Sequence, residues 1–218
     1  MSEDDKGLWY GDWNPWVRDP IDVLRATFFV GAVIFAVTGH FGAAVRMGLT
    51  FVLVVGVRLV QLPRPFDLGF LVGMALQAWG NGLGLFTHWP WWDVVVHFVL
   101  PFFTAPALYI LLARLEVVPD LDEDTEAHHY LGILLVTFAL GLTVGAIYEM
   151  YEWFDDTVFG AHLHVGYDDT IADLFDDALA SLGGGALLVW WATHGWGTTR
   201  RISGRRLTKR IRRRRSAA

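Results

Sequence analysis

The chain has 218 residues, of which 54% are hydrophobic and only 18% charged, and it contains no Cys. Soluble domains carry about 25% charged residues, so this composition excludes a disordered chain, and the lack of Cys excludes a disulfide scaffold and a Cys-ligated metal site. The net charge of −6 is unevenly divided. Residues 200–215 hold 10 of the 17 Lys and Arg, whereas residues 1–199 hold 7 of them and all 23 acidic side chains.

Six apolar stretches follow one another along the chain, and most approach the ~20 helical residues that cross a hydrocarbon core. They cover residues 23–38, 43–60, 68–86, 93–113, 130–152 and 171–193. The second is the weakest, because only residues 47–57 are free of charge. The sequence therefore predicts an all-α polytopic membrane protein with six transmembrane helices. Its membrane domain would cover residues 21–196, between an N-terminal segment at 1–20 and a basic tail at 197–218.

The distribution of basic residues predicts the orientation of these spans. Six spans place both termini on one side of the membrane, and 16 of the 17 Lys and Arg fall on that side; Arg46 does not. Cytoplasmic loops are rich in Lys and Arg, so we expect a protein of the inner (plasma) membrane with both termini cytoplasmic. The N-terminal segment is acidic and aromatic rather than basic, and we expect no cleavable signal peptide.

The basic tail at residues 200–215 allows two interpretations. It could bind nucleic acid, or it could fix the orientation of the last span and bind anionic lipid head groups, at about 1 kcal/mol per basic residue. We favour the lipid interpretation, because the basic residues form a terminal run and not a folded basic face. Membrane lipids, and not nucleic acid, are therefore the expected partners.

Chemically informative residues lie at the predicted outer ends of the last three spans. The fourth span opens with Asp93 and His97, which are four residues apart and share a helical face. The fifth ends with Glu149 and Glu152, three residues apart. The sixth opens with a run of aspartates that includes Asp169, Asp173, Asp176 and Asp177.

Small residues predict that two of these faces meet. Gly141 and Gly145 form a stripe on the fifth span that leads to the glutamates, and Ala180 and Gly184 form one on the sixth that leads to the aspartates. Such stripes let membrane helices approach closely, so we expect Glu149 to lie within about 15 Å of Asp173 on the facing span.

Simpler roles are available for some of these acids. Asp93 and Asp169 could be helix N-caps, for which Asp is favoured. Asp173 and Asp177 lie too far into the span for capping, and Glu149 is at a helix C-terminal end, where negative charge is unfavourable.

The charge balance on the outer side favours a bound cation. Ten carboxylates are predicted there: Asp93, Glu149, Glu152, Asp155, Asp156, Asp168, Asp169, Asp173, Asp176 and Asp177. They face a single basic residue, Arg46. Clustered carboxylates must take up protons or bind a cation, and ionisable groups inside a membrane are functional by default.

The donor types indicate which cation would bind. Oxygen ligands alone suit Mg²⁺, Ca²⁺ or Mn²⁺, and the imidazole of His97 shifts the preference toward Zn²⁺, Mn²⁺ or Fe²⁺. We therefore expect a divalent metal ion, which could be Zn, Mn, Fe or Mg. On the third span, Gln77 and Asn81 are predicted to form hydrogen bonds between helices.

Three sequence elements resemble the YjdF-like family of bacterial inner-membrane proteins over roughly residues 20–195. They are Asp93-x₃-His97-Phe98, Tyr148-Glu149-x₂-Glu152-Trp153 and the aspartate run at 169–177 that leads to Gly183. The aspartate run is also similar to the C-terminal stretch of VanZ-like proteins. The resemblance implies a multi-pass membrane protein and supplies no reaction.

Three functions remain open from the sequence. The first is a metal-dependent hydrolase of a lipid or envelope precursor, with Glu149 as general base and the acids and His97 as metal ligands. The second is a transporter of a divalent cation, or a proton-coupled carrier, which would need polar residues continuing toward the cytoplasmic side. Few are present there, chiefly Thr137, Thr143, Ser181 and Thr193. The third is a non-catalytic membrane scaffold.

Overall fold

The computed structural model describes residues 20–60, 62–115, 117–119, 121, 127–159 and 166–194. The predicted basic tail lies outside these residues, as does all of the predicted N-terminal segment except Pro20.

All regular structure in the described ranges is helical, as predicted. Six long helices match the six apolar stretches: α2 (Ile21–Val37), α3 (Phe41–Arg58), α4 (Arg64–Gly82), α6 (Trp92–Arg114), α7 (Ala127–Phe159) and α8 (Tyr167–Thr193). The sequence did not predict the short α5 (Leu85–His88), or that α7 continues past Glu152 to Phe159.

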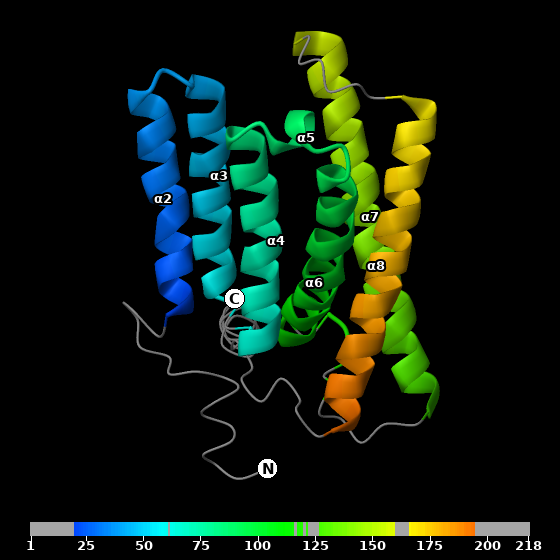
Figure 1. Ribbon diagram of the computed structural model, residues 1–218. Helices are drawn as coiled ribbons and strands as arrows, with labels where there is room; N and C mark the ends of the chain where they lie inside the picture. The colour runs from blue at the N-terminus through cyan, green and yellow to red at the C-terminus, as the bar shows by residue number, and fades with distance from the viewer. Residues whose placement is uncertain are drawn as a thin grey trace, which may run out of the picture.

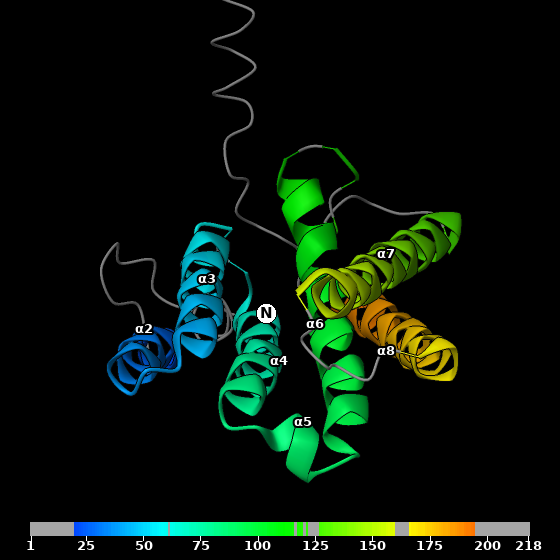
Figure 2. The same ribbon diagram turned by 90° about the horizontal axis from the view of Figure 1, so that it is seen from above.

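The long helices alternate in direction and stand side by side (Figure 1). Seen from above, α2, α3 and α4 lie on one side and α6, α7 and α8 on the other, with α4 packed against α6 (Figure 2). We call the end of the bundle where α6 and α8 begin and α7 ends the upper end, as it is drawn in Figure 1, and the other the lower end.

The surface of this bundle is that of a membrane protein. Within the described ranges, three helices are long and apolar enough to cross a membrane: Phe41–Arg58, Trp92–Arg114 and Ala127–Val158. Large apolar side chains are exposed along them, such as Phe41 (70% exposed), Leu49 (66%) and Met150 (70%). Exposed apolar surface on this scale marks contact with lipid or with another protein. The fold is therefore that of an all-α polytopic membrane protein.

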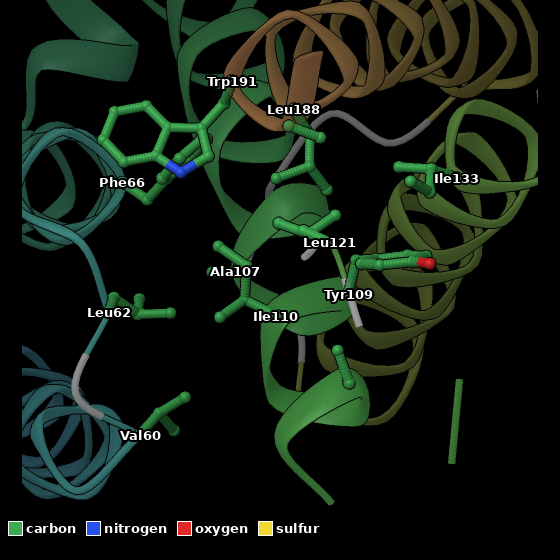
Figure 3. Packing of buried hydrophobic residues seen from close by; sticks show 12 residues of the cluster. Val60, Leu62, Phe66, Ala107, Tyr109, Ile110, Leu121, Ile133, Leu188 and Trp191 are labelled. Carbon is green, nitrogen blue, oxygen red and sulfur yellow. The ribbon is translucent and has the colours of Figure 1, made fainter. Parts of the chain in front are cut away.

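Apolar packing closes the lower end of the bundle. Figure 3 shows its main cluster, in which Phe66 of α4, Ile110 of α6, and Leu188 and Trp191 of α8 are buried together. The rings of Phe66 and Trp191 meet edge to face at 5.3 Å. A second cluster, which includes Phe28, joins α2, α3 and α4. Together the two clusters hold the six long helices in one bundle.

The predicted stripe on α7 packs against α8. A Cβ on Gly141 would overlap Ser181, and a Cβ on Gly145 would overlap the carboxylate of Asp177. Glycine at these two positions therefore lets polar side chains of α8 enter the interface.

The predicted partner stripe on α8 is wrong in one position. A Cβ on Gly184 would overlap the carbonyl oxygen of Phe102 on α6, and it is Gly185 that lies against Leu134 and Thr137 of α7. The reason is that α8 packs against both α6 and α7, so adjacent small residues on it face different neighbours.

Buried ion pairs gather at the lower end of α2, α3 and α4. Arg25, only 4% exposed, pairs with Asp22 at 2.7 Å and with Asp67, and it donates a hydrogen bond to the carbonyl of Val54. Arg58 pairs with Asp22 at 3.1 Å. Sequence reasoning treated both arginines as markers of orientation and missed these pairs. The three-residue spacing of Asp22 and Arg25 was the available signal.

Candidate metal centre

His97 is the centre of the candidate site. It lies on the second turn of α6, is 4% exposed, and its Nδ1 is 3.2 Å from Oδ1 of Asp177 on α8. An ionised carboxylate can only accept hydrogen bonds, so the Nδ1–H donates to Asp177. In the neutral imidazole, the lone pair of Nε2 is then available on the other side of the ring.

Two carboxylates face this lone pair. Nε2 is 3.7 Å from Oδ1 of Asp93 and 3.8 Å from Oε1 of Glu149. Both distances exceed those of hydrogen bonds. Ligand atoms on one tetrahedral metal ion, each about 2.1 Å from it, lie about 3.4 Å apart, so the spacing around Nε2 is close to that of metal ligands.

Five of the predicted ligands fall into two overlapping groups. In each group the ligand atoms lie within 4.8 Å of one another; the groups are Asp93, His97 and Asp173, and His97, Glu149 and Glu152. Glu149 and Asp173 are both this close to His97, which confirms the expected approach of α7 and α8.

The remaining predicted residues occupy other positions. Asp177 contacts His97 through Nδ1. Asp169 is exposed and Asp176 is half-buried, and neither belongs to a group of candidate ligands among the described residues. Asp93 and Asp169 are not the N-caps of α6 and α8, which are Trp91 and Gly166, but both lie in the first helical turn, where the helix dipole favours an acidic side chain.

Four polar atoms of the centre are buried without a hydrogen-bond partner in the described part of the chain. They are His97 Nε2, Glu149 Oε1, Asp173 Oδ2 and Asp177 Oδ2. Leaving a buried polar atom unpaired costs about 1–3 kcal/mol, and more for a charged group. All four are acceptors once the carboxylates are ionised and Nδ1 carries the imidazole proton, so they cannot satisfy one another.

Among the described residues, no Lys or Arg pairs with these acids at close range, and His97 is the single basic side chain in contact with them. Among the ion pairs of the described residues, those that involve Asp93, Glu149 and Asp177 are formed with His97 alone. The site is therefore rich in ligands and poor in cations.

Three polar side chains that sequence reasoning did not assign to the centre lie near its carboxylates. The Tyr148 hydroxyl accepts a hydrogen bond from Nε2 of Gln77, which confirms the predicted interhelix role of Gln77, and it lies beside Glu152. The Thr170 hydroxyl lies beside Glu149. Tyr148 could have been found from its place beside Glu149, whereas Thr170 gave no signal of its own.

A small cavity of about 40 Å³ is lined by His97, Tyr148 and Asp177, and two larger cavities adjoin the centre. One of about 470 Å³ lies between α7 and α8, and its lining includes Glu149, Trp153, Tyr167 and Thr170. The other, of about 350 Å³, lies between α7 and the pair α3 and α4. The carboxylates are thus within reach of molecules that enter from two sides.

The fold and site define a polytopic membrane protein with a buried cluster of carboxylates and one imidazole. Residues 21–196 match a family described as predicted membrane protein (DUF2238), and the chain belongs to that family. No curated protein and no solved structure matches the chain.

Proposed function

We propose that the centre binds a divalent metal ion and that the protein is a metal-dependent hydrolase of a lipid or envelope precursor. The observation that carries the proposal is the convergence of buried, unpartnered acceptor atoms on His97. A buried acidic cluster without a compensating cation is unfavourable, and a metal ion would supply both the charge and the missing partners.

The geometry supports a division of roles among the predicted ligands. Nε2 of His97, Asp93 and Glu149 would bind the metal, with Asp173 or Glu152 completing the set. Asp177 would orient His97 through Nδ1, as carboxylates commonly do for metal-bound imidazoles. One imidazole among carboxylates favours Zn²⁺, Mn²⁺ or Fe²⁺, with Mg²⁺ as the alternative.

Glu149 is our candidate general base. A bound divalent metal lowers the pKa of its water to about 7, and a nearby carboxylate can then accept the proton. Glu149 faces Nε2 and also lines the largely apolar cavity between α7 and α8. An apolar substrate and the reacting water could therefore meet at this side chain.

Hydrolysis is tested in proteoliposomes of a bacterial polar lipid extract. Protein stripped with EDTA receives Zn²⁺, Mn²⁺, Fe²⁺ or Mg²⁺, and the lipids are followed by mass spectrometry. We expect a metal-dependent loss of one lipid class that Glu149→Gln abolishes. The exposed neighbour Asp168 supplies the matched control, Asp168→Asn, which should retain activity. A lipid profile that no metal changes would contradict the hydrolase proposal.

A cation or proton carrier is the second candidate, and one observation favours it. The hydroxyls of Ser181 and Thr137 are fully buried below Asp177 and have no hydrogen-bond partner among the residues described. The exposed Thr143, in contrast, donates to the carbonyl of Ala139. Buried hydroxyls of this kind are satisfied by internal water, which would extend the polar region toward the lower end.

Cysteine accessibility separates the carrier from the hydrolase, because the chain has no Cys of its own. A carrier predicts that Thr137→Cys and Ser181→Cys react with a small water-soluble methanethiosulfonate, while the lipid-facing Thr143→Cys does not. Protection of both buried positions would argue against the carrier. A non-catalytic scaffold would be favoured only if no metal binds.

The cellular setting is also part of the proposal. The distribution of basic residues supports an inner-membrane protein with both termini cytoplasmic and with the tail on anionic lipids. The YjdF-like resemblance is compatible with the family match and belongs to the same proposal. Reporter fusions at the two termini test the orientation, and an extracytoplasmic signal from either would contradict it.

A further inference from the structure

The cavity between α3, α4 and α7 has a graded lining. Helix α3 descends from the upper end, so Arg46 lies above Leu53, whereas α4 and α7 ascend and place Asn81 and Asp155 above Met74 (Figure 1). The upper part of the cavity is therefore polar and the lower part apolar. Its volume of about 350 Å³ is within the usual range of ligand sites.

This cavity shares a wall with the candidate metal centre. Glu152 lines the cavity and belongs to one of the groups of candidate ligands. Tyr148 also lines it, and its ring lies edge-on to His97 at 5.7 Å. A molecule in the cavity would therefore reach the candidate ligand Glu152 directly and be separated from His97 by the ring of Tyr148.

Arg46 gives the polar part a specific chemistry. It is the one basic residue of a lining that also holds the carboxylates of Glu152 and Asp155, and it forms no ion pair with them or with another described residue. Its guanidinium matches the geometry of a phosphate, which it can bind through two parallel hydrogen bonds. The uncharged donors nearby, Asn81 and Tyr151, suit the ester or hydroxyl groups of a lipid head.

The lower part is suited to an acyl chain. Leu49 and Leu53 are 66% and 48% exposed on α3, and Met74 faces them from α4. Because Leu49 and Leu53 line the cavity and are exposed on the surface of the bundle, a chain could enter from the membrane along α3.

We propose that this cavity binds a phosphate-bearing lipid, with the phosphate at Arg46 and an acyl chain along Leu49 and Leu53. The claim that this cavity is the substrate site of the hydrolase depends on the proposed function. The binding of the lipid itself needs no metal. It names the substrate class: a lipid that presents a phosphate head group beside Glu152.

Binding is measured by native mass spectrometry of the full-length protein in detergent after EDTA treatment. The probes are dioleoyl phosphatidylglycerol and dioleoyl glycerol, which differ in the phosphate head group. Inorganic phosphate is added as a competitor. Because the measurement is made without metal, its result does not depend on whether the centre binds metal. Conversely, the protein could bind metal and still fail to bind the lipid, so the two proposals can fail separately.

We expect dioleoyl phosphatidylglycerol to bind about tenfold more tightly than dioleoyl glycerol, and Arg46→Gln to remove this preference. Leu53→Trp should fill the lower part of the cavity and weaken binding of both lipids about tenfold. Val52→Trp is the matched control, because Val52 is exposed on the same helix and is not part of the lining.

Three results would overturn the proposal. The first is equal affinity of the wild-type protein for the two lipids. The second is an equal lipid affinity of the Leu53→Trp and Val52→Trp variants. The third is full displacement of the lipid by millimolar inorganic phosphate, which would assign the cavity to a soluble anion.

Discussion

Two buried charged clusters lie at opposite ends of this bundle, and they differ in balance. At the lower end, Asp22 and Asp67 are paired with Arg25 and Arg58. At the upper end, His97 is surrounded by Asp93, Glu149, Asp173 and Asp177 without a close Lys or Arg in the described structure.

The difference indicates what each cluster is for. Charge balance and direct hydrogen bonds make the lower cluster self-sufficient, so it can hold α2, α3 and α4 together without a ligand. The upper cluster has unsatisfied acceptors and excess carboxylates, and in the function proposed above it takes up a cation from solution. Removing a charge should therefore have opposite effects on stability at the two ends.

The largest effect on stability is expected from a substitution in the lower cluster. Arg25→Met removes the guanidinium from the buried carboxylates of Asp22 and Asp67, of which Asp22 keeps its pair with Arg58, and should lower the free energy of unfolding by about 3–5 kcal/mol. Thermal and denaturant unfolding in detergent measure the loss. Arg46→Gln is the control, because Arg46 is exposed and unpaired among the described residues. Equal stability of the two variants would contradict a structural role for the lower cluster.

At the upper end, Glu149→Gln should weaken metal binding about 100-fold, or by 2.7 kcal/mol. Without metal, the same variant should be as stable as the wild type or more stable, because a neutral amide replaces a buried carboxylate. Melting temperatures in EDTA and in excess metal separate the two effects. A loss of stability in EDTA similar to that of Arg25→Met would show that the clusters do not differ.

Loss of the contact that orients His97 is expected to have a smaller effect on metal binding. Asp177→Asn keeps the shape of the side chain but removes the charge that fixes Nδ1 as the donor, and should weaken metal binding about 10- to 100-fold. Calorimetric titration measures the affinity. An unchanged affinity would mean that Asp177 does not act through His97.

The smallest effect on metal binding is expected from a substitution at the interface between α7 and α8. A Cβ on Gly145 would overlap the Asp177 carboxylate, so Gly145→Ala should displace that carboxylate and weaken metal binding about tenfold. Gly132→Ala is the matched control on the same helix, since a Cβ there meets no atom within 4 Å in the described structure. Identical affinities for the two variants would rule out this steric role.

The sequence predicted the upper cluster better than the lower one, for a physical reason. Helical periodicity places Asp93 with His97 and Glu149 with Glu152, and the glycine stripe brings α7 onto α8. Periodicity within single helices could not predict that Asp67 meets Arg25, because that pair depends on how α2 and α4 are rotated about their axes. The rotation of α8 about its axis likewise could not be predicted, because α8 packs against two neighbours. This is why Gly185 faces α7 and not the predicted Gly184. The same limit also explains why Thr170 was missed, since its contact with Glu149 depends on the relative rotation of α7 and α8.

The metal content of the detergent-purified protein tests the central claim most directly. After incubation with Zn²⁺, Mn²⁺, Fe²⁺ or Mg²⁺ and removal of free metal, elemental analysis should find about one ion per wild-type chain. Glu149→Ala and His97→Ala should hold almost none, and Asp168→Asn should match the wild type. The absence of stoichiometric metal from the wild-type protein, or its full retention by His97→Ala, would contradict the account.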